Sequence, residues 1–360
     1  LFFYFDDLSK VFNKYDLDTQ VILFSFSSCC LIVIYNLFTK LLVHKNESKK
    51  FALTDSLYKI SLTTSSIILV LYLKNYWAVI YGTFLSTLVF VSYLIYENRK
   101  SFIIKFSFKD LKESIFFSFP NTINEVQIIA KNAFDKIYLY KLTGASNVGF
   151  LDVANKFGNL VKLFYNSVAF SFTPFFMNLA KKNDLMSSQK ISERYFEITI
   201  FFNLLALLIS FFSEEIIYIL TDSTFHYIRF FVPLLVLNVY VGEIFSLCFK
   251  SVIFYKSKMK YNIPVTFVSL FSNIICNIIL IPIYEIWGVI FSLLISNTLT
   301  SILMFVISYR LKVIKINLFK FIFQLVLHLI FLTILYKLLY SDYSLITKIF
   351  IKISCVTVYS

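Results

Sequence analysis

Charged residues are scarce in this chain: they make up 15% of its 360 residues, whereas hydrophobic residues make up 58%. A domain of this length needs a much larger share of polar residues on its surface to be soluble in water. The chain also has only six glycines, which excludes most glycine-rich nucleotide-binding loops. The composition therefore predicts that lipid is the solvent for most of the protein.

Cysteine and histidine are rare as well. The five cysteines lie in apolar runs, and the three histidines, His44, His226 and His328, are far apart in sequence. Neither set has the spacing of a disulfide framework or a metal site. The sequence thus predicts no metal, no cofactor and no enzymatic chemistry. We also expect no nucleic-acid partner despite the net charge of +13, because no stretch combines basic and aromatic residues on a sufficiently polar surface.

What the chain does have is long apolar runs. A helix needs about 20 apolar residues to cross a bilayer. Runs of suitable length fall near 20–43, 52–73, 76–97, 115–140, 147–176, 195–212, 227–250, 261–282, 286–309 and 317–339, and another begins near 344. Both faces of most runs are apolar, which favours lipid-embedded helices over barrel strands. The expected fold class is an all-α polytopic membrane protein.

The loops between these runs alternate in charge. Basic loops lie near 45–50, 99–112, 181–194, 256–260 and 310–315, and the intervening loops are poor in lysine and arginine. Because short basic loops remain in the cytoplasm, this alternation predicts the orientation of every span. The segment 213–225 is expected to be a short amphipathic helix at the outer interface.

The sequence contains a parallel internal repeat. Trp77–Tyr81 matches Trp287–Phe291 at an offset of 210 residues, and the same offset aligns Lys40 with Lys250. Such repeats are typical of transporters built from two similar halves. We therefore expect 20–97 to superpose on 230–307. Residues 1–7 align with 211–217, so about three helices are expected to precede Leu1, and we expect the chain to be truncated at both ends.

Two of the spans carry polar side chains along one side. In the spans near 115–140 and 147–176, these residues fall within arcs of roughly 140° and roughly 120° of the helix. Charged groups inside a membrane require mutual pairing, a water-filled cavity, or both. Lysines outnumber acids on the stripes, which suits a phosphate and sugars. The predicted substrate-binding residues are Lys131, Lys136, Lys156, Lys162, Asn159 and Asn166.

Two other interpretations of these stripes remain open. Asp152 with Lys156, and Asp135 with Lys131 or Lys136, could form ion pairs that hold helices together. Alternatively, the acids could couple transport to a proton or cation gradient, and the candidates are Glu125, Asp135 and Asp152. Other intramembrane polar residues, which we expect mainly to join helices, are Asn238, Asn273, Asn277, Asn297, Gln324 and His328. For Glu243, helix joining and substrate binding are left equally open.

The sequence resembles the polysaccharide flippases of the multidrug/oligosaccharidyl-lipid/polysaccharide exporter superfamily. The resemblance lies in Ala133–Lys136, Leu142–Gly144, Val148–Phe150, Ala154–Lys156, Asn273, Asn277, Ile281–Tyr284 and Trp287–Gly288. The chain departs from the family at Glu285, where glycine is common, and at Val289–Ile290, which replaces a pair of small residues.

This resemblance implies two pseudo-symmetric six-helix bundles around a central cavity, followed by two extra C-terminal helices. Residues 1–112 would then hold the last three helices of the N-terminal bundle and a cytoplasmic linker. Residues 113–312 would form the C-terminal bundle, and 313–360 the additional, incomplete helices. The implied location is the bacterial cytoplasmic (inner) membrane.

The implied function is to translocate an undecaprenyl-diphosphate-linked oligosaccharide for the synthesis of O-antigen, lipopolysaccharide or a related polysaccharide. Its expected partners are the lipid-linked oligosaccharide, membrane lipid, and glycan polymerase or assembly proteins. Two alternatives are a drug/cation antiporter of the same superfamily and a polysaccharide polymerase or glycosyltransferase. The cavity lysines disfavour the first, and short outer loops disfavour the second.

Overall fold

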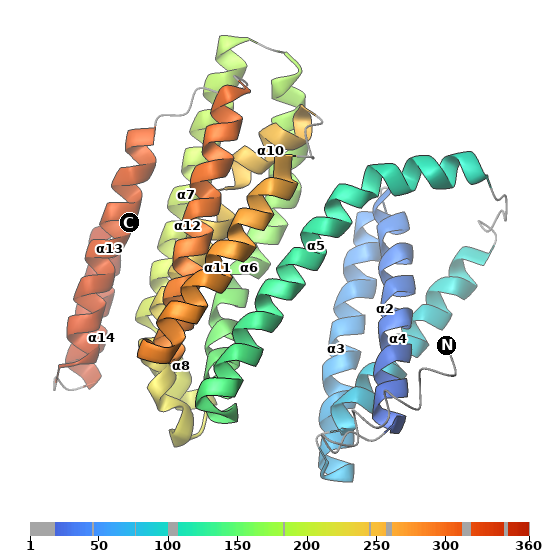
Figure 1. The fold of residues 1–360 in the computed structure, drawn as a ribbon, viewed down its shortest axis with the longest axis horizontal. Coiled ribbons are helices and arrows are strands. Elements are labelled where there is room, and N and C mark those ends of the chain that lie inside the picture. The colour runs from blue at the N-terminus through green and yellow to red at the C-terminus, as the bar shows by residue number, and fades with distance from the viewer. Residues whose placement is uncertain are drawn as a thin grey trace. The chain divides into compact units, whose positions relative to one another are not determined.

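The computed structural model of the protein describes residues 19–44, 47–75, 77–99, 107–182, 184–244, 246–256, 261–311, 318–341 and 345–359. The regular structure in these ranges is entirely helical (Figure 1). The chain falls into two compact units that divide between Ser107 and Phe108. The described helices include eight that are long and apolar enough to cross a membrane. The expected all-α polytopic fold class is therefore confirmed.

The first unit contains three long helices: α2 (Thr19–His44), α3 (Ser48–Leu73) and α4 (Ala78–Asn98). Its buried cluster includes Tyr35, Phe38 and Leu94. Gly82 of α4 lies so close to α3 that an added Cβ would be 2.7 Å from the Ser66 Cα atom. Small residues let helices approach in this way where lipid supplies no hydrophobic driving force between them.

The second unit contains the remaining described elements. They are α5 (Phe108–Thr143), α6 (Ala145–Ala180), α7 (Leu185–Phe211), α8 (Ser213–Leu220), the 3-10 helix η3 (Ser223–Phe230), α9 (Val232–Val239), the π-helix η4 (Tyr240–Ile244), α10 (Leu247–Tyr255), α11 (Asn262–Tyr284), α12 (Ile286–Arg310), α13 (Leu318–Leu339) and α14 (Leu345–Tyr359). The longest, α5 and α6, are the two that carry the polar stripes.

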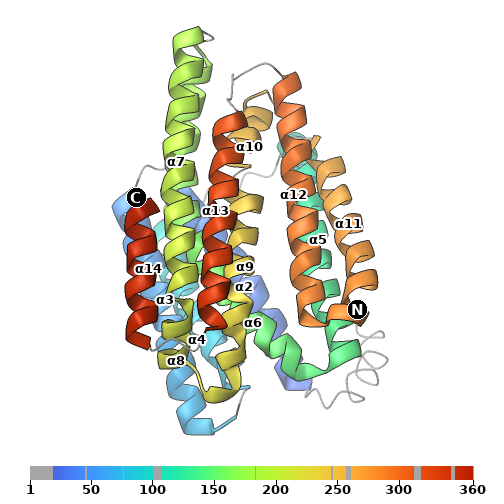
Figure 2. The same ribbon diagram turned by 90° about the vertical axis from the view of Figure 1, so that its left-hand side faces the viewer.

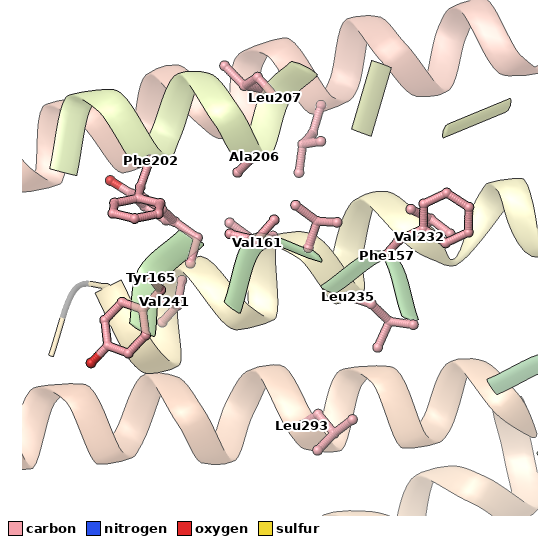
Figure 3. Close-up of a cluster of buried hydrophobic side chains, with 14 of the residues drawn as sticks. Phe157, Val161, Tyr165, Phe202, Ala206, Leu207, Val232, Leu235, Val241 and Leu293 are labelled. Carbon is pink, nitrogen blue, oxygen red and sulfur yellow. The ribbon is translucent and has the colours of Figure 1, made fainter. Parts of the chain in front are cut away.

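One side of α6 is embedded in the apolar core of this unit. Phe157, Val161 and Tyr165 recur every four residues and are buried, and they belong to the same cluster as residues of α7 and α9, including Phe202 and Leu235 (Figure 3). Side chains four residues apart lie on one face of a helix. The opposite side of α6 is therefore left for its polar residues, and the packed face fixes where they lie.

The span expected near 227–250 is interrupted by a π-helical turn. The helices α9 and α10 are separated by η4, whose looser turn leaves backbone carbonyls to be satisfied by side chains. The hydroxyl of Ser301 on α12 donates to the Val241 carbonyl at 2.8 Å, and Ser246 donates to the Gly242 carbonyl at 2.7 Å. These bonds allow the interruption to exist inside a membrane-spanning segment.

The last two helices, α13 and α14, lie beside α7 (Figure 2). The buried His328 of α13 contacts Asn203 of α7 through a hydrogen bond, as expected for a residue that packs helices. Lys352 of α14 is fully buried and donates to Glu214 and Glu215 of α8 at 3.2 and 2.7 Å. In this way α14 is held by the short helix expected within 213–225.

The helices recur at nearly the repeat offset. The set α2, α3 and α4 begins at residues 19, 48 and 78, and the corresponding α9, α11 and α12 begin at 232, 262 and 286. Residues 1–18, on which the alignment with 211–217 rests, lie outside the described residues, as do several of the basic loop lysines. The expected three-part division at 112 and 312 stays a prediction.

Candidate functional site

Helix α5 packs along α11 (Figure 1) and carries a row of buried polar side chains. Asn124, Gln127, Lys131 and Asp135 follow at intervals of three or four residues and are all buried. This spacing aligns their side chains on one face of the helix. The Asn124 side chain accepts a hydrogen bond from Thr266 of α11 at 2.9 Å. Polar groups thus join α5 to α11 at several levels.

Lys131 has a complete set of partners. Its ammonium group donates to Ser296 Oγ at 2.7 Å, Asn297 Oδ1 at 3.0 Å and Ser269 Oγ at 3.3 Å. An ammonium group has three donor hydrogens, so these three oxygens of α11 and α12 satisfy it. Only 8% of the residue is exposed. Lys131 therefore supplies a fixed positive charge inside the helix bundle.

Asp135 lies one turn further along the same face and is 4% exposed. The side-chain amide of Asn277 donates to its carboxylate and also to Asn273 Oδ1, at 3.1 Å in the second case. Asn277 Oδ1 is buried and has no hydrogen-bond partner among the described residues. A buried carboxylate beside an unsatisfied amide oxygen offers acceptors to a proton or a small cation.

This network extends across the bundle through Asn297. Its oxygen accepts from Lys131, and its amide nitrogen donates to Asn238 Oδ1 of α9 at 2.9 Å. Gly242 of η4 lies directly against it, since an added Cβ would be 3.0 Å from Asn297 Nδ2. Asn297 therefore contacts both the α5 charge and the π-helical turn.

A second charged cluster is formed by Glu243 of η4 and two lysines. Glu243 accepts from Lys162 of α6 at 3.0 Å through one carboxylate oxygen and from Lys250 of α10 at 2.8 Å through the other. The side chains of Lys162 and Lys250 are 46% and 40% exposed, and that of Glu243 is 27% exposed. Two cations thus share one partly accessible anion near the middle of a membrane-spanning segment.

A third pair joins the C-terminal part of α5 to the N-terminal part of α6. Lys136 and Asp152 lie 2.8 Å apart, with side chains 48% and 45% exposed. Asp152 therefore bonds across helices to Lys136 in place of the helical-spacing partner Lys156 considered from the sequence. Asp135 and Asp152 have different partners, Asn277 and Lys136 respectively.

The structure separates the predicted site residues into two groups. Lys131 and Asp135 are buried against α11. The remaining candidates are exposed or half-exposed on α5 and α6, and they are Glu125, Lys136, Asp152, Lys156, Asn159, Lys162 and Asn166. Substrate contact by these residues stays a prediction.

Sequence reasoning missed the role of several residues that complete these clusters. Ser269 and Ser296 bond Lys131, and Lys250 shares Glu243 with Lys162. Serine is too common in membrane helices to be distinctive. The spacing of Ser269, Asn273 and Asn277, four residues apart, was the available signal for a polar face on α11.

The fold has known counterparts. The structure of the lipid II flippase MurJ in an inward closed conformation matches 94% of this chain and 73% of its own, with a TM-score of 0.67 and 17% identity. An outward-facing multidrug resistance MATE family transporter of the MOP superfamily matches 82% of this chain and 70% of its own, with a TM-score of 0.61 and 16% identity. A MOP superfamily transporter from Pyrococcus furiosus matches 79% and 67%, with a TM-score of 0.56 and 15% identity.

These likenesses show that the chain shares its fold with these proteins. The chain spans between 66% and 73% of the length of such structures. No curated protein sequence matches the chain. A family model described as "Polysaccharide biosynthesis protein" matches residues 1–180, which is half of the chain. The resemblance drawn from the sequence motifs is thereby confirmed, and the chain belongs to the polysaccharide biosynthesis protein family.

Proposed function

We propose that this protein is a flippase that moves an undecaprenyl-diphosphate-linked oligosaccharide from the cytoplasmic to the outer leaflet. The observation that carries the proposal is the row of accessible ammonium and amide groups along α6, at Lys156, Asn159, Lys162 and Asn166. A diphosphate and its sugars cannot cross about 30 Å of hydrocarbon without such groups. The prenyl tail can remain in lipid throughout.

Membership in a polysaccharide biosynthesis family supports the substrate class, and the fold shared with a lipid II flippase supports the reaction class. In this proposal the accessible lysines, including Lys136, bind the diphosphate as point charges, while asparagines bond sugar hydroxyls. The proposed location is the bacterial inner membrane, with the basic loops in the cytoplasm. Residues 113–312 act as one bundle, and 313–360 as an addition to it.

The test is export of lipid-linked oligosaccharide in a flippase-deficient strain and in proteoliposomes. Lys156→Gln and Lys162→Gln should each reduce export about tenfold or more, because a hydrogen bond to a charged group contributes about 1.5–3 kcal/mol. Lys182→Gln, at an exposed position after α6, is the matched control and should export normally. Normal export by both α6 variants, at wild-type protein levels, would contradict the proposal.

We further propose that Asp135 couples transport to an ion gradient, with Asn273 and Asn277 as its neighbours. Of the three acids considered, Asp135 is buried and faces polar groups of another helix, whereas Asp152 is paired with Lys136 and Glu125 is exposed. In this proposal Lys131, one turn away on α5, supplies the positive charge beside Asp135. In its presence, a proton or cation bound at Asp135 alters the net charge of the network.

This second proposal is tested in proteoliposomes with an imposed proton or sodium gradient. Asp135→Asn keeps the shape of the side chain but removes its charge, so it should abolish the gradient dependence of export. Asp152→Asn is the matched control and should retain that dependence. Gradient-driven export by Asp135→Asn at the wild-type rate would place coupling elsewhere.

A drug/cation antiporter remains the second candidate because the fold is shared with a multidrug resistance MATE transporter. An antiporter would have to hold amphipathic cations beside the lysines of α6, which repel them. Efflux of ethidium from vesicles distinguishes the two functions. Ethidium efflux that survives in Lys162→Gln, without any movement of lipid-linked oligosaccharide, would favour the antiporter.

A further inference from the structure

The cluster of Lys162, Glu243 and Lys250 has features that a simple helix-joining ion pair does not require. Lys162 lies at the middle of α6, and Glu243 lies at the middle of the apolar span Val232–Ile253. All three side chains are partly exposed there. A charged group exposed at this depth needs water or a polar ligand beside it. A polar ligand can therefore reach these partly exposed side chains.

The backbone around the cluster is built for close approach. Gly158, one turn before Lys162, brings α6 against α9, since an added Cβ would be 3.1 Å from Val239 Cγ2 and 3.5 Å from the Leu235 carbonyl oxygen. Glu243 itself lies in the π-helical turn, and such turns occur frequently at functional sites. The short distance between the helices lets a lysine of α6 reach a carboxylate of η4.

The charges in the cluster do not balance. One carboxylate receives two ammonium groups, one on each oxygen, which leaves a net charge of +1. The shared carboxylate also brings the two ammonium groups to a separation that one diphosphate can span. A diphosphate carries more negative charge than the carboxylate and presents more acceptor oxygens to the same donors. It can therefore replace the carboxylate as the partner of both lysines.

We propose that Glu243 is an exchangeable counter-ion: it holds Lys162 and Lys250 when the site is empty and yields them to a substrate diphosphate. This inference rests on the proposed flippase function and adds Glu243 and Lys250 to its binding site. When no substrate is bound, Glu243 keeps the two ammonium groups oriented. It also speeds release, because Glu243 competes with the bound anion for the same ammonium groups.

The first experiment measures binding of inorganic pyrophosphate to the purified full chain. Glu243→Gln removes the competing charge but keeps the side-chain shape, so pyrophosphate should bind about tenfold more tightly, a change that corresponds to one charge-assisted contact. Adding Lys250→Gln to that variant should remove the gain. The matched control is Glu197→Gln, which frees Arg194 from an exposed pair of 2.7 Å and should leave the affinity unchanged. Equal affinities for Glu243→Gln and Glu197→Gln would overturn the inference.

A second measurement needs no variant and covers the case in which Glu243→Gln does not fold. Carbodiimide joins a carboxylate to an amine with which it is in direct contact. In the wild-type chain, saturating pyrophosphate should remove most of the Glu243–Lys162 and Glu243–Lys250 cross-links found by mass spectrometry. The Asp55–Lys59 pair of α3, 2.6 Å apart, should still cross-link. Unchanged cross-links to Glu243 would show a purely structural pair.

The source of the phosphate is resolved by repeating the cross-linking in nanodiscs. Zwitterionic lipid should leave the Glu243 cross-links intact, and added undecaprenyl diphosphate should remove them. If phosphatidylglycerol alone removes them, the site binds anionic lipid headgroups and the inference of a diphosphate site fails.

Transport separates this inference from the proposed function. With lipid-linked oligosaccharide, Glu243→Gln should lower both KM and kcat, because binding is strengthened and release is slowed. If the wild type exports no lipid-linked oligosaccharide but pyrophosphate still displaces Glu243, the proposed flippase function is wrong and the anion-binding site stands. If export is normal but pyrophosphate does not displace Glu243, only the inference about Glu243 is wrong.

Discussion

At the scale of single residues, the backbone of Glu285 adopts a conformation that favours glycine. Its φ is 50° and its ψ is −123°, in the turn between α11 and α12. A side chain at positive φ is strained by contact between its Cβ and the backbone, and such strain costs of order 1–3 kcal/mol. Glu285→Gly should therefore stabilise the protein by about 1 kcal/mol once the greater freedom of glycine in the unfolded chain is subtracted. Thermal unfolding in detergent measures the change.

Lys74 provides the comparison for that prediction. It also has a positive φ, 49°, but its ψ of 31° lies in the left-handed helical region that ordinary residues tolerate better. Lys74→Gly should therefore give a smaller gain than Glu285→Gly. An equal or lower melting temperature for Glu285→Gly would show that the glutamate is not strained.

The same scale shows what the sequence could and could not predict about the site. The departure at Glu285 was visible in the sequence, but its conformational reason required the structure. The helical period placed Lys131 and Lys136 on one stripe, although five residues separate two side chains by about 140° around a helix. That arc is wide enough to include both the face packed on α11 and an exposed face. Only the position of α11 determines that Lys131 is buried and Lys136 is exposed.

At the scale of helices, the contact between α11 and α12 depends on Gly288. An added Cβ would lie 2.5 Å from the Leu280 carbonyl oxygen and 2.6 Å from its carbon, so the backbones would have to move apart. Gly288→Ala should destabilise the second unit by about 1–3 kcal/mol, as overpacking does elsewhere. Thermal unfolding of the purified chain measures this loss.

Gly149 is the matched control because it is also helical but has nothing within 4 Å of an added Cβ. Gly149→Ala should be neutral or stabilising, by up to about 1 kcal/mol, since alanine is the better helix former. If the two variants unfold at the same temperature, close packing at Gly288 does not contribute to stability.

The start of α7 should respond to pH through Asp184. Its side chain caps the helix by accepting from the backbone N–H of Ser187, and the Ser187 hydrogen bonds lower the pKa of the carboxyl. A lowered native pKa means that the cap stabilises the folded state above the unfolded pKa of about 3.9, and that this contribution is lost as pH falls through the native value.

Hydrogen exchange of the first turn of α7 checks this sign. Acidification should reduce protection in the wild type relative to Asp184→Asn, because asparagine caps the helix but does not titrate. A ratio of exchange rates that stays constant from neutral pH to below pH 4 would contradict the proposed role of the carboxyl.

At the scale of the whole molecule, the lipid environment made the helices predictable. A bilayer requires long apolar runs and internally bonded backbone, so hydropathy alone indicated the eight spans that the described helices contain. The spans expected near 115–140 and 147–176 are helical, as α5 and α6, but they are not among these eight. The π-helical turn within 227–250 was not predictable, because Ser301 of another helix supplies one of its hydrogen bonds. Tertiary contacts of this kind leave no local pattern in the sequence.

The orientation of the chain in the membrane is the remaining prediction at this scale. The basic residues after α6, including Lys181 and Lys182, should face the cytoplasm, and η3 should face outward. We expect Lys182→Cys to react with a membrane-impermeant maleimide only in inverted vesicles, and Thr224→Cys only in intact cells; both positions are exposed.

The five native cysteines are free and lie within helices, and thiols surrounded by lipid should react poorly. Labelling of the unmodified chain gives the background. Reaction of both introduced cysteines from the same side would contradict the assigned topology, and with it the direction of transport, because the predicted span α7 lies between the two positions in the chain.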